Sequence, residues 1–380
     1  MISMSPSCDT DFHSTLRLPY ATESQTKIAT LTLEAGSRYQ HEQDNHPPNN
    51  AMPSPFPPTS TTPGHGIIHL TLLPPSHPTF STLTYTYPLK LLPSTPHILL
   101  PPPNPPSTPH PTTVPLLFLL TYGGGLLSPD HISLTITLDP HTRLTLTTQG
   151  STKIFKPSLH PAPTTRQDLH VRVGAHAALW LAPDPVQPFA GSVYAQTQVF
   201  EVERGGSVGV VDWVCEGRKA RGERWACEGW RGRNEIWGVG GDGGKRMLVR
   251  DAVRLEGGDI GGRMDGMGVF GTVLMRGPLF EGLGRFFVEE FGGLPRIGGR
   301  EWGGGGEVRE RTEKERWRSE RVEREKGDGL LWTACFVRGC TVVKFSAREV
   351  EGVKSWLASM LKEEGTIGRE CGEGGLMFVR

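Results

Sequence analysis

A strict alternation of apolar and polar residues is the clearest pattern in this chain. Residues 132–138 place Ile or Leu at every second position with Ser or Thr between them, and residues 144–147 repeat the pattern. Period-two alternation is typical of half-buried β-strands. Residues 139–142, Asp-Pro-His-Thr, join the two segments, and proline presets the φ angle that a tight turn needs. We therefore expect two half-buried antiparallel strands connected by a turn.

Similar short segments continue along the chain and predict a mainly β protein. Gly and Pro clusters separate them, which is typical of a large antiparallel sandwich or a wound β-assembly. The expected strands are residues 67–73, 83–89, 171–181, 193–202, 208–214, 234–237, 246–255, 268–275, 331–337 and 341–345.

Few segments have helical periodicity. The clearest begins at Ser346, where Glu349 three residues later predicts a capping box. Apolar residues then recur at helical spacing as far as Leu361, with Trp356 on the flank. A second, weaker helix is expected over residues 279–291. Together they predict a small helical part near the C-terminus.

Composition changes along the chain without indicating two domains. Pro and His concentrate before residue 200, and Gly and Arg after it, yet strand-like alternation continues across that border. We expect a disordered, proline-rich lead-in at 1–63 and one β-rich domain at 64–295. A Gly-rich and charged insertion at 296–328 should be a solvated helix or mobile segment, and 329–372 should complete the domain.

Charge and cysteine content limit the class of protein. The formal net charge is zero, so bulk electrostatics predict neither a nucleic-acid nor a membrane partner. Six cysteines form no dense framework, which is typical of a reduced, intracellular chain. The first twenty residues lack the apolar core of a secretory signal. We expect a cytoplasmic protein.

Three glycine-rich motifs resemble those of enzymes. Residues 205–209 fit the nucleophile elbow G-x-S-x-G around Ser207, but strand-like spacing follows and no histidine occurs after His176. Residues 238–243 fit G-x-G-x-x-G, yet an extended segment follows, so a hairpin tip is expected. Residues 243–245, Gly-Gly-Lys, lack the earlier glycine and the following Ser or Thr of a phosphate loop. A hydrolase using Ser207 is kept as an alternative.

One protein family matches several motifs in order. Residues 121–157 read TYGGGLLSPDHISLTITLDPHTRLTLTTQGSTKIFKP, residues 87–91 YPLKL, 180–185 WLAPDP, 217–223 GRKARGE and 233–236 RNEI, and Asp251 follows another strand. This order resembles the urease accessory protein UreD (UreH) family over roughly 64–295 and again from 331. The resemblance implies an elongated, two-layered antiparallel β-assembly with a small C-terminal helical part.

The same resemblance implies a urease maturation factor with no catalytic centre. Such a protein is a scaffold that binds apo-urease and a UreF-like accessory protein, through which a UreG-like GTPase is recruited. It has no tightly bound cofactor, and transient nickel passes through a water-filled passage toward the urease active site. A metal-free interaction protein is a further alternative.

Polar residues at the predicted strand ends are the candidates for partner contacts or an ion path. They are Asp130, Thr148, Gln149, Lys153, Asp184, Arg221, Glu223, Arg233 and Glu235. Each could instead fix a loop or satisfy a turn backbone. Carboxylates that hold a divalent ion weakly would suit transit, which favours Asp130, Asp184 and Glu223. The metal ligands are not assigned.

Overall fold

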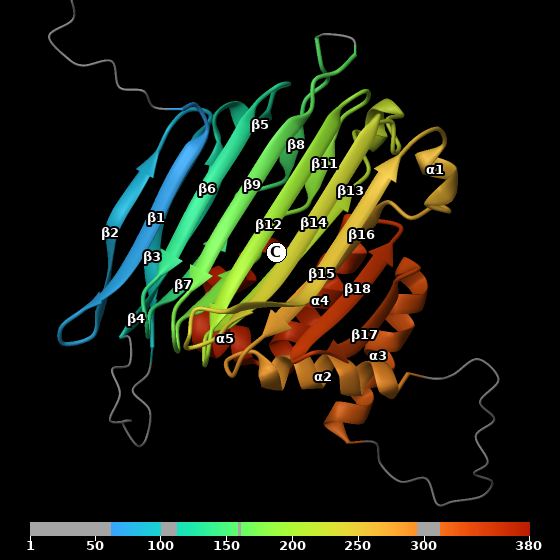
Figure 1. Cartoon of the computed structure of the whole chain (residues 1–380). Coiled ribbons are helices and arrows are strands. Elements are labelled where there is room, and N and C mark those ends of the chain that lie inside the picture. Colours follow the sequence, from blue (N-terminus) through green and yellow to red (C-terminus); the bar gives the residue numbers. More distant parts are fainter. Residues whose placement is uncertain (1–61, 100–111, 159–160, 295–311) are drawn as a thin grey trace, which may run out of the picture. The chain divides into compact units, whose positions relative to one another are not determined.

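The computed structural model describes residues 62–99, 112–158, 161–294 and 312–380 (Figure 1). The predicted lead-in at 1–63 therefore lies outside the described residues, apart from its last two positions. Within the described part the chain is mainly β, as predicted, with two sheets and a small set of C-terminal helices.

A seven-stranded sheet forms the first layer. Its order is β15 (Lys245–Glu256), β14 (Gly229–Val239), β12 (Val193–Glu203), β9 (Thr165–Val173), β6 (His131–Leu138), β1 (His65–Leu73) and β2 (His77–Tyr85). An eleven-stranded sheet forms the second. Its main path is β17 (Leu331–Val337), β18 (Cys340–Ala347), β16 (Val269–Arg276), β13 (Ser207–Cys215), β10 (Ala178–Leu181), β7 (Arg143–Thr147), β4 (Thr113–Thr121) and β3 (Leu89–Ile98), with β5 (Gly125–Leu126), β8 (Thr152–Ile154) and β11 (Val186–Pro188) beside it.

The predicted antiparallel pairing is wrong for the central strands. Strand β6 pairs with β1 and β9, whereas β7 pairs with β4 and β10, and all four pairings are parallel. The turn after β6 therefore carries the chain from one sheet to the other, and the chain winds between two layers. Alternation identifies a half-buried strand, but the pattern is the same whether the neighbouring strand runs parallel or antiparallel to it. Antiparallel pairs occur at the margins, as in β1·β2, β14·β15 and β17·β18.

The connections between sheets also correct two predicted strands. Residues 171–181 contain a turn that separates β9 from β10, and residues 83–89 span the end of β2 and the start of β3. At successive connections the rings of His141 and His176 stack, with centroids 5.2 Å apart. Gly205 follows in the next connection at φ +78°, and a Cβ there would lie 2.8 Å from His176 Nδ1. Glycine is required at this position by both conformation and space.

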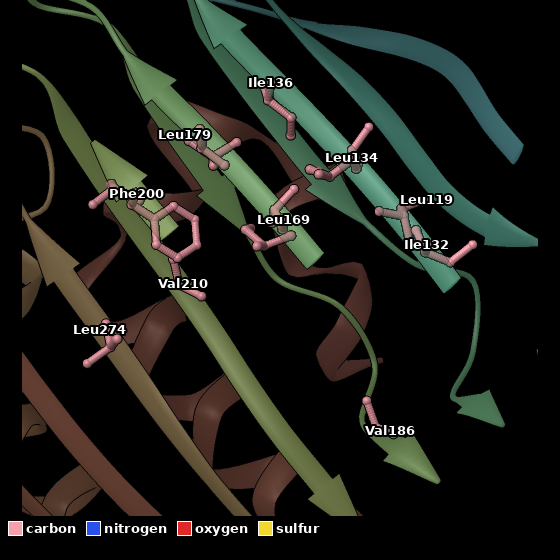
Figure 2. Close-up of a cluster of buried hydrophobic side chains, with 14 of the residues drawn as sticks. Leu119, Ile132, Leu134, Ile136, Leu169, Leu179, Val186, Phe200, Val210 and Leu274 are labelled. Carbon is pink, nitrogen blue, oxygen red and sulfur yellow. The ribbon is translucent and has the colours of Figure 1, made fainter. Parts of the chain in front are cut away.

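The core between the sheets contains apolar side chains from both layers. Figure 2 shows Ile132, Leu134, Ile136, Leu169 and Phe200 of the seven-stranded sheet beside Leu119, Leu179, Val186, Val210 and Leu274 of the other. A second apolar cluster lies between the opposite face of the eleven-stranded sheet and the C-terminal helices, drawn orange to red in Figure 1. The eleven-stranded sheet is thus covered on both faces.

Most of the helices follow β16 in the sequence. They are α1 (Ile260–Arg263), α2 (Glu281–Gly292), α3 (Glu313–Asp328), α4 (Val350–Glu364) and α5 (Thr366–Cys371), with 3-10 turns η1 (Tyr122–Gly124), η2 (Lys219–Arg221) and η3 (Glu373–Val379). None of the helices that the structure describes is long and apolar enough to cross a membrane.

The helix predicted from Ser346 exists but begins four residues later. Ser346 belongs to β18, where its hydroxyl donates to the Val269 carbonyl, so it cannot cap a helix. Glu349 is the N-cap residue of α4 and makes no side-chain cap bond. Trp356, predicted on the flank, is buried. The helix predicted at 279–291 is confirmed as α2.

The charged segment at 296–328 is less solvated than its composition suggests. Its first part lies outside the described residues, and its second part forms α3, which begins with a capping box between Thr312 and Glu315. Arg321 on α3 is only 1% exposed and lies between the rings of Trp317 and Trp332. Balanced charge predicted a solvated helix, but several of these charges are paired in the interior.

Candidate functional site

Polar side chains interrupt the apolar core between the two sheets. Strand β12 alternates so that Tyr194, Gln196, Gln198 and Phe200 all point inward and are buried. Amides in the middle of such a face need partners, because an unpaired buried polar group is costly. The partners come from the neighbouring strand β14 and from β13 across the interior. This set is called the interior polar cluster below.

Asp212 on β13 is the centre of the cluster. Its Oδ1 accepts a hydrogen bond from Gln196 Nε2 at 2.9 Å, and its Oδ2 accepts from Asn234 Nδ2 at 2.6 Å. Gln198 Nε2 donates to Asn234 Oδ1 at 3.0 Å, and the Tyr194 hydroxyl donates to Gln196 Oε1 at 3.0 Å. The chain of bonds therefore links both sheets through one carboxyl group.

Burial decides the electrostatics of this carboxyl group. Asp212 makes no ion pair with any cation of the described residues. Burial raises its pKa above the ordinary value, and the nearby Asp251 adds to that rise, while the amide donors Asn234 and Gln196 oppose it. Burial, followed by the charge of Asp212, also raises the pKa of Tyr194 well above its usual value. The interior therefore contains a carboxyl group that holds its proton more tightly than usual.

A second polar group continues the path toward β18. Asp251 on β15 accepts a hydrogen bond from the Thr272 hydroxyl at 3.0 Å and forms an ion pair with Lys344. Lys344 Nζ also donates to Thr272 Oγ1 at 2.8 Å. Asp251 lies opposite Asn234 in the β14·β15 register, and Thr272 lies opposite Asp212 in β13·β16. Polar side chains thus continue from Asp212 to the edge of the interior.

The other end of the path lies at the loops after β7 and β10. The backbone amide of Asp184 donates to Thr148 Oγ1 at 2.8 Å, and Asp184 Oδ2 accepts the backbone amide of Gly150 at 2.9 Å. Lys354 of α4 places its Nζ 3.4 Å from Asp184 Oδ1. Thr148 and Asp184 are both buried. The two predicted residues therefore form one arrangement beside the interior.

A cavity of about 30 Å³ joins these groups. Thr148 and Asp184 line one part of it, and Gln196, Gln198 and Asp212 line another. Gln167 Oε1 on β9 is buried in this region without a hydrogen-bond partner among the described residues. A cavity of this volume, lined in part by polar groups, accommodates one or two water molecules, and they would satisfy that oxygen.

This interior does not contain a strong metal site. No group of three or more His, Cys, Asp or Glu side chains that could hold a metal ion occurs within the described ranges. The cluster offers carboxyl, carboxamide and hydroxyl oxygens. These atoms can hydrogen-bond to water, and as hard ligands they can coordinate a weakly held divalent ion.

The other predicted site residues are not brought into this interior. Gln149, Lys153, Arg221 and Arg233 are exposed, and Asp130 accepts the Leu127 backbone amide in its own turn. The two remaining acidic residues form local ion pairs. Glu223 pairs with Arg218, which lowers its pKa despite the opposing effect of partial burial. Glu235 accepts a hydrogen bond from Arg250 at 3.0 Å on the outer face of β14.

The interior residues that were not among the predicted site residues are Gln196, Gln198, Asp212 and Asn234, of which Asn234 lies inside the RNEI motif. A sequence signal existed for the first two, because an alternating strand with glutamine on its apolar face is unusual. Asn234 lies between Arg233 and Glu235, and its inward direction follows from the register of β14. Asp212 could be identified only after β13 was placed opposite β12.

Ser207 does not form a nucleophile elbow. It is the first residue of β13, so a strand follows it where an elbow has a helix. Its side chain is buried, and its Oγ accepts the backbone amide of Leu279 at 3.1 Å. The motif at 238–243 lies at the hairpin between β14 and β15, as predicted.

Comparison with known proteins gives one family. A family model described as "UreD urease accessory protein" matches residues 76–370. The chain is 40% identical over 174 residues to urease accessory protein 4 of Cryptococcus neoformans, covering 42% of this chain and half of that protein. It is 28% identical over 256 residues to a ureD-like urease accessory protein of Schizosaccharomyces pombe, covering 65% and 81%. It is 37% identical over 139 residues to urease accessory protein D of Arabidopsis thaliana, covering 36% and 43%.

Proposed function

Because the chain belongs to the UreD urease accessory protein family, we propose that it is a non-catalytic urease maturation factor acting in the cytoplasm. It is a scaffold that binds apo-urease and a UreF-like accessory protein, and the UreF-like protein connects it to a UreG-like GTPase. Nickel is its cargo and is delivered toward the urease active site. The interior polar cluster is the observation that supports this role.

The chemistry of the cluster suits a cargo that must be released. Oxygen ligands from Asp212, Gln196 and Gln198 would replace part of the hydration of a divalent ion without enclosing it. The cavity of about 30 Å³ has room for one or two waters. A hydrated ion is larger, so passage requires the ion to lose water or the two sheets to separate locally. The Asp212 proton would leave when a cation arrives, because metal ligands must be deprotonated.

Deleting the gene tests the role of the whole chain. Urea hydrolysis under nickel-limited growth should be lost, and the full-length chain should restore it. A tagged chain should also co-purify apo-urease and the UreF-like protein. Normal urease activity in the deletion strain would contradict the proposal.

Two alternative functions can be tested, a hydrolase that uses Ser207 and a metal-free interaction protein. Ser207→Ala should leave urease activation intact and lower the free energy of unfolding by about 1 kcal/mol, since the Leu279 amide loses its acceptor. Loss of activation in a folded Ser207→Ala protein would favour the hydrolase. If the chain were a metal-free interaction protein, the effect of deleting it should not depend on the nickel supply.

A further inference from the structure

The interior between the two sheets opens along one side, beside strand β17. Strand β15 is the last strand of the seven-stranded sheet, whereas the other sheet continues through β16 and β18 to β17. Alternate residues of β17 lie on the same side of the sheet as Lys344 of β18 and are exposed; they are Leu331, Thr333, Cys335 and Val337. Lys344 therefore lies where the covered interior meets an uncovered face of the sheet.

The groups around the Lys344 ammonium are ones that also suit a metal cation. Lys344 Nζ pairs with Asp251 Oδ1 and donates to Thr272 Oγ1 at 2.8 Å. The Thr272 hydroxyl donates in turn to Asp251 Oδ2 at 3.0 Å. The Phe270 ring centroid lies 5.5 Å from Nζ, and an aromatic face attracts a positive charge. Carboxylate and hydroxyl oxygens are also ligands of hard divalent ions, so this position is built for a cation.

A second carboxyl group lies behind the Lys344–Asp251 pair. Thr272 is opposite Asp212 in the β13·β16 register. Burial raises the pKa of Asp212, Asp251 adds to the rise, and Lys344 is among the groups that oppose it. Within the described residues, Lys344 is the one cation that pairs with Asp251. Without its ammonium, two acidic side chains would face this part of the interior with no positive charge between them.

The Lys344 ammonium can leave this position while Asp251 stays. It ends a flexible four-carbon stem, and its side chain is 28% exposed whereas that of Asp251 is 13% exposed. Thr333, opposite Lys344 on β17, is exposed, so the stem can turn toward solvent on that side. Asp251 is fixed by its strand and by the Thr272 hydroxyl.

We propose that Lys344 is a tethered cation that fills a divalent-cation position formed by Asp251, Thr272 and Asp212, and that a divalent ion binds there by displacing the ammonium. The proposal rests on the proposed function for the identity of the cargo, and it deepens that function by assigning a release device. The ammonium balances the acidic interior when no ion is present. It also competes with a bound ion, which keeps binding weak and reversible.

Binding of Mn²⁺ to the purified full-length chain tests this assignment. Mn²⁺ suits oxygen ligands better than imidazole, and the electron paramagnetic resonance signal of free Mn²⁺ measures what remains unbound. Lys344→Met should bind Mn²⁺ at least about tenfold more tightly than wild type, because the carboxylate no longer has a competing cation. Adding Asp251→Asn to Lys344→Met should abolish the gain. Lys362→Met is the control, since Lys362 is exposed at the end of α4, and it should bind Mn²⁺ as wild type does.

Two further measurements keep the test decisive if the unpaired Asp251 carboxylate unfolds Lys344→Met. Mn²⁺ should then restore its folding, seen by circular dichroism, because a ligand that binds only the native state stabilises it. Lys344→Arg keeps a cation beside Asp251 and should bind Mn²⁺ as weakly as wild type.

Three results would overturn the proposal. They are Mn²⁺ binding by Lys344→Met that is no tighter than that of wild type, equally tight binding by Lys344→Arg or by the double variant, and an unfolded Lys344→Met that Mn²⁺ does not restore. These measurements involve neither urease nor nickel, so their failure would leave the deletion experiment as a separate test of the proposed function.

Discussion

The ionised form of Asp212 is unfavourable in the folded protein, because burial removes water from its carboxylate and two amide donors return only part of the lost stabilisation. Groups of this kind are retained where chemistry or binding needs them. In this chain the carboxyl group of Asp212 links both sheets and faces a cavity with room for one or two water molecules. Under the proposed function, it is the residue that would exchange its proton for a divalent cation.

The raised pKa of Asp212 predicts how stability changes with pH. The native state holds this proton more tightly than the unfolded chain. The contribution of this group to the free energy of unfolding therefore falls as pH rises from about 4 through the raised native pKa. The fall is about 1.4 kcal/mol for each unit by which the pKa is raised.

Urea denaturation at a series of pH values measures this effect as a difference between proteins. Wild type should lose stability relative to Asp212→Asn across that window, and the difference should be constant above it. Asp265→Asn is the matched control, since Asp265 is exposed and asparagine tolerates its φ of +48°. A pH-independent difference between wild type and Asp212→Asn would contradict the raised pKa.

The connections between the sheets are the elements that define this fold. Those that follow β6, β9 and β12 pass from the seven-stranded to the eleven-stranded layer, and they place His141, His176 and Gly205 in successive positions. The stacked rings leave no room for a side chain at the third position.

Gly205→Ala tests that geometry. The substitution forces a Cβ into the left-handed region and against the His176 ring, so unfolding free energy should fall by about 1–2 kcal/mol from the backbone alone, with the steric clash added. Gly241→Ala is the control, because nothing lies within 4 Å of the added Cβ. Adding His176→Ala to Gly205→Ala should recover the steric part. Equal stability of the two glycine variants in urea denaturation would count against the packing described.

Helix α3 is attached to the body of the protein by buried charge. Arg321 donates to Glu290 at 3.2 Å and pairs with Glu325. Burial opposes ionisation of Glu290, but Arg318 and Arg321 outweigh it and hold its pKa below the usual value. Burial raises the pKa of Glu325, which has one arginine partner.

Arg321→Ala should be strongly destabilising, by about 3–5 kcal/mol, because it leaves the buried carboxylate of Glu325 without its cation and Glu290 with Arg318 alone. Arg324→Ala on the same helix should have little effect, since Arg324 is exposed and donates to the Glu320 carbonyl of its own helix. Chemical denaturation of both proteins makes the comparison. Similar midpoints would show that α3 does not depend on this buried cation.

The sequence was informative about elements and less so about their partners. Strands β12 and β13 could be predicted from period-two alternation, and helix α2 from helical spacing. Both patterns arise locally, from the apolar residues that a strand or a helix turns toward the core. Parallel pairing of β6 and the start of α4 depended on distant strands, which periodicity does not contain. For the site, motifs indicated Thr148 and Asp184, whereas Asp212 required the facing strand to be known.

At the scale of the described molecule, one polar path runs between two β-layers. It extends from Thr148 and Asp184 through the cavity and Asp212 to Asp251 and Lys344. Apolar residues of both sheets surround it. A polar path of this kind, in a family of urease accessory proteins, is the basis for the proposed delivery of nickel.

The nickel content of urease purified from cells that carry Asp212→Asn measures that proposal most directly. The account predicts severalfold less nickel per urease than with wild type or Asp265→Asn, while Asp212→Asn still folds and still co-purifies apo-urease. Full nickel loading by a folded Asp212→Asn protein would contradict transit through the interior.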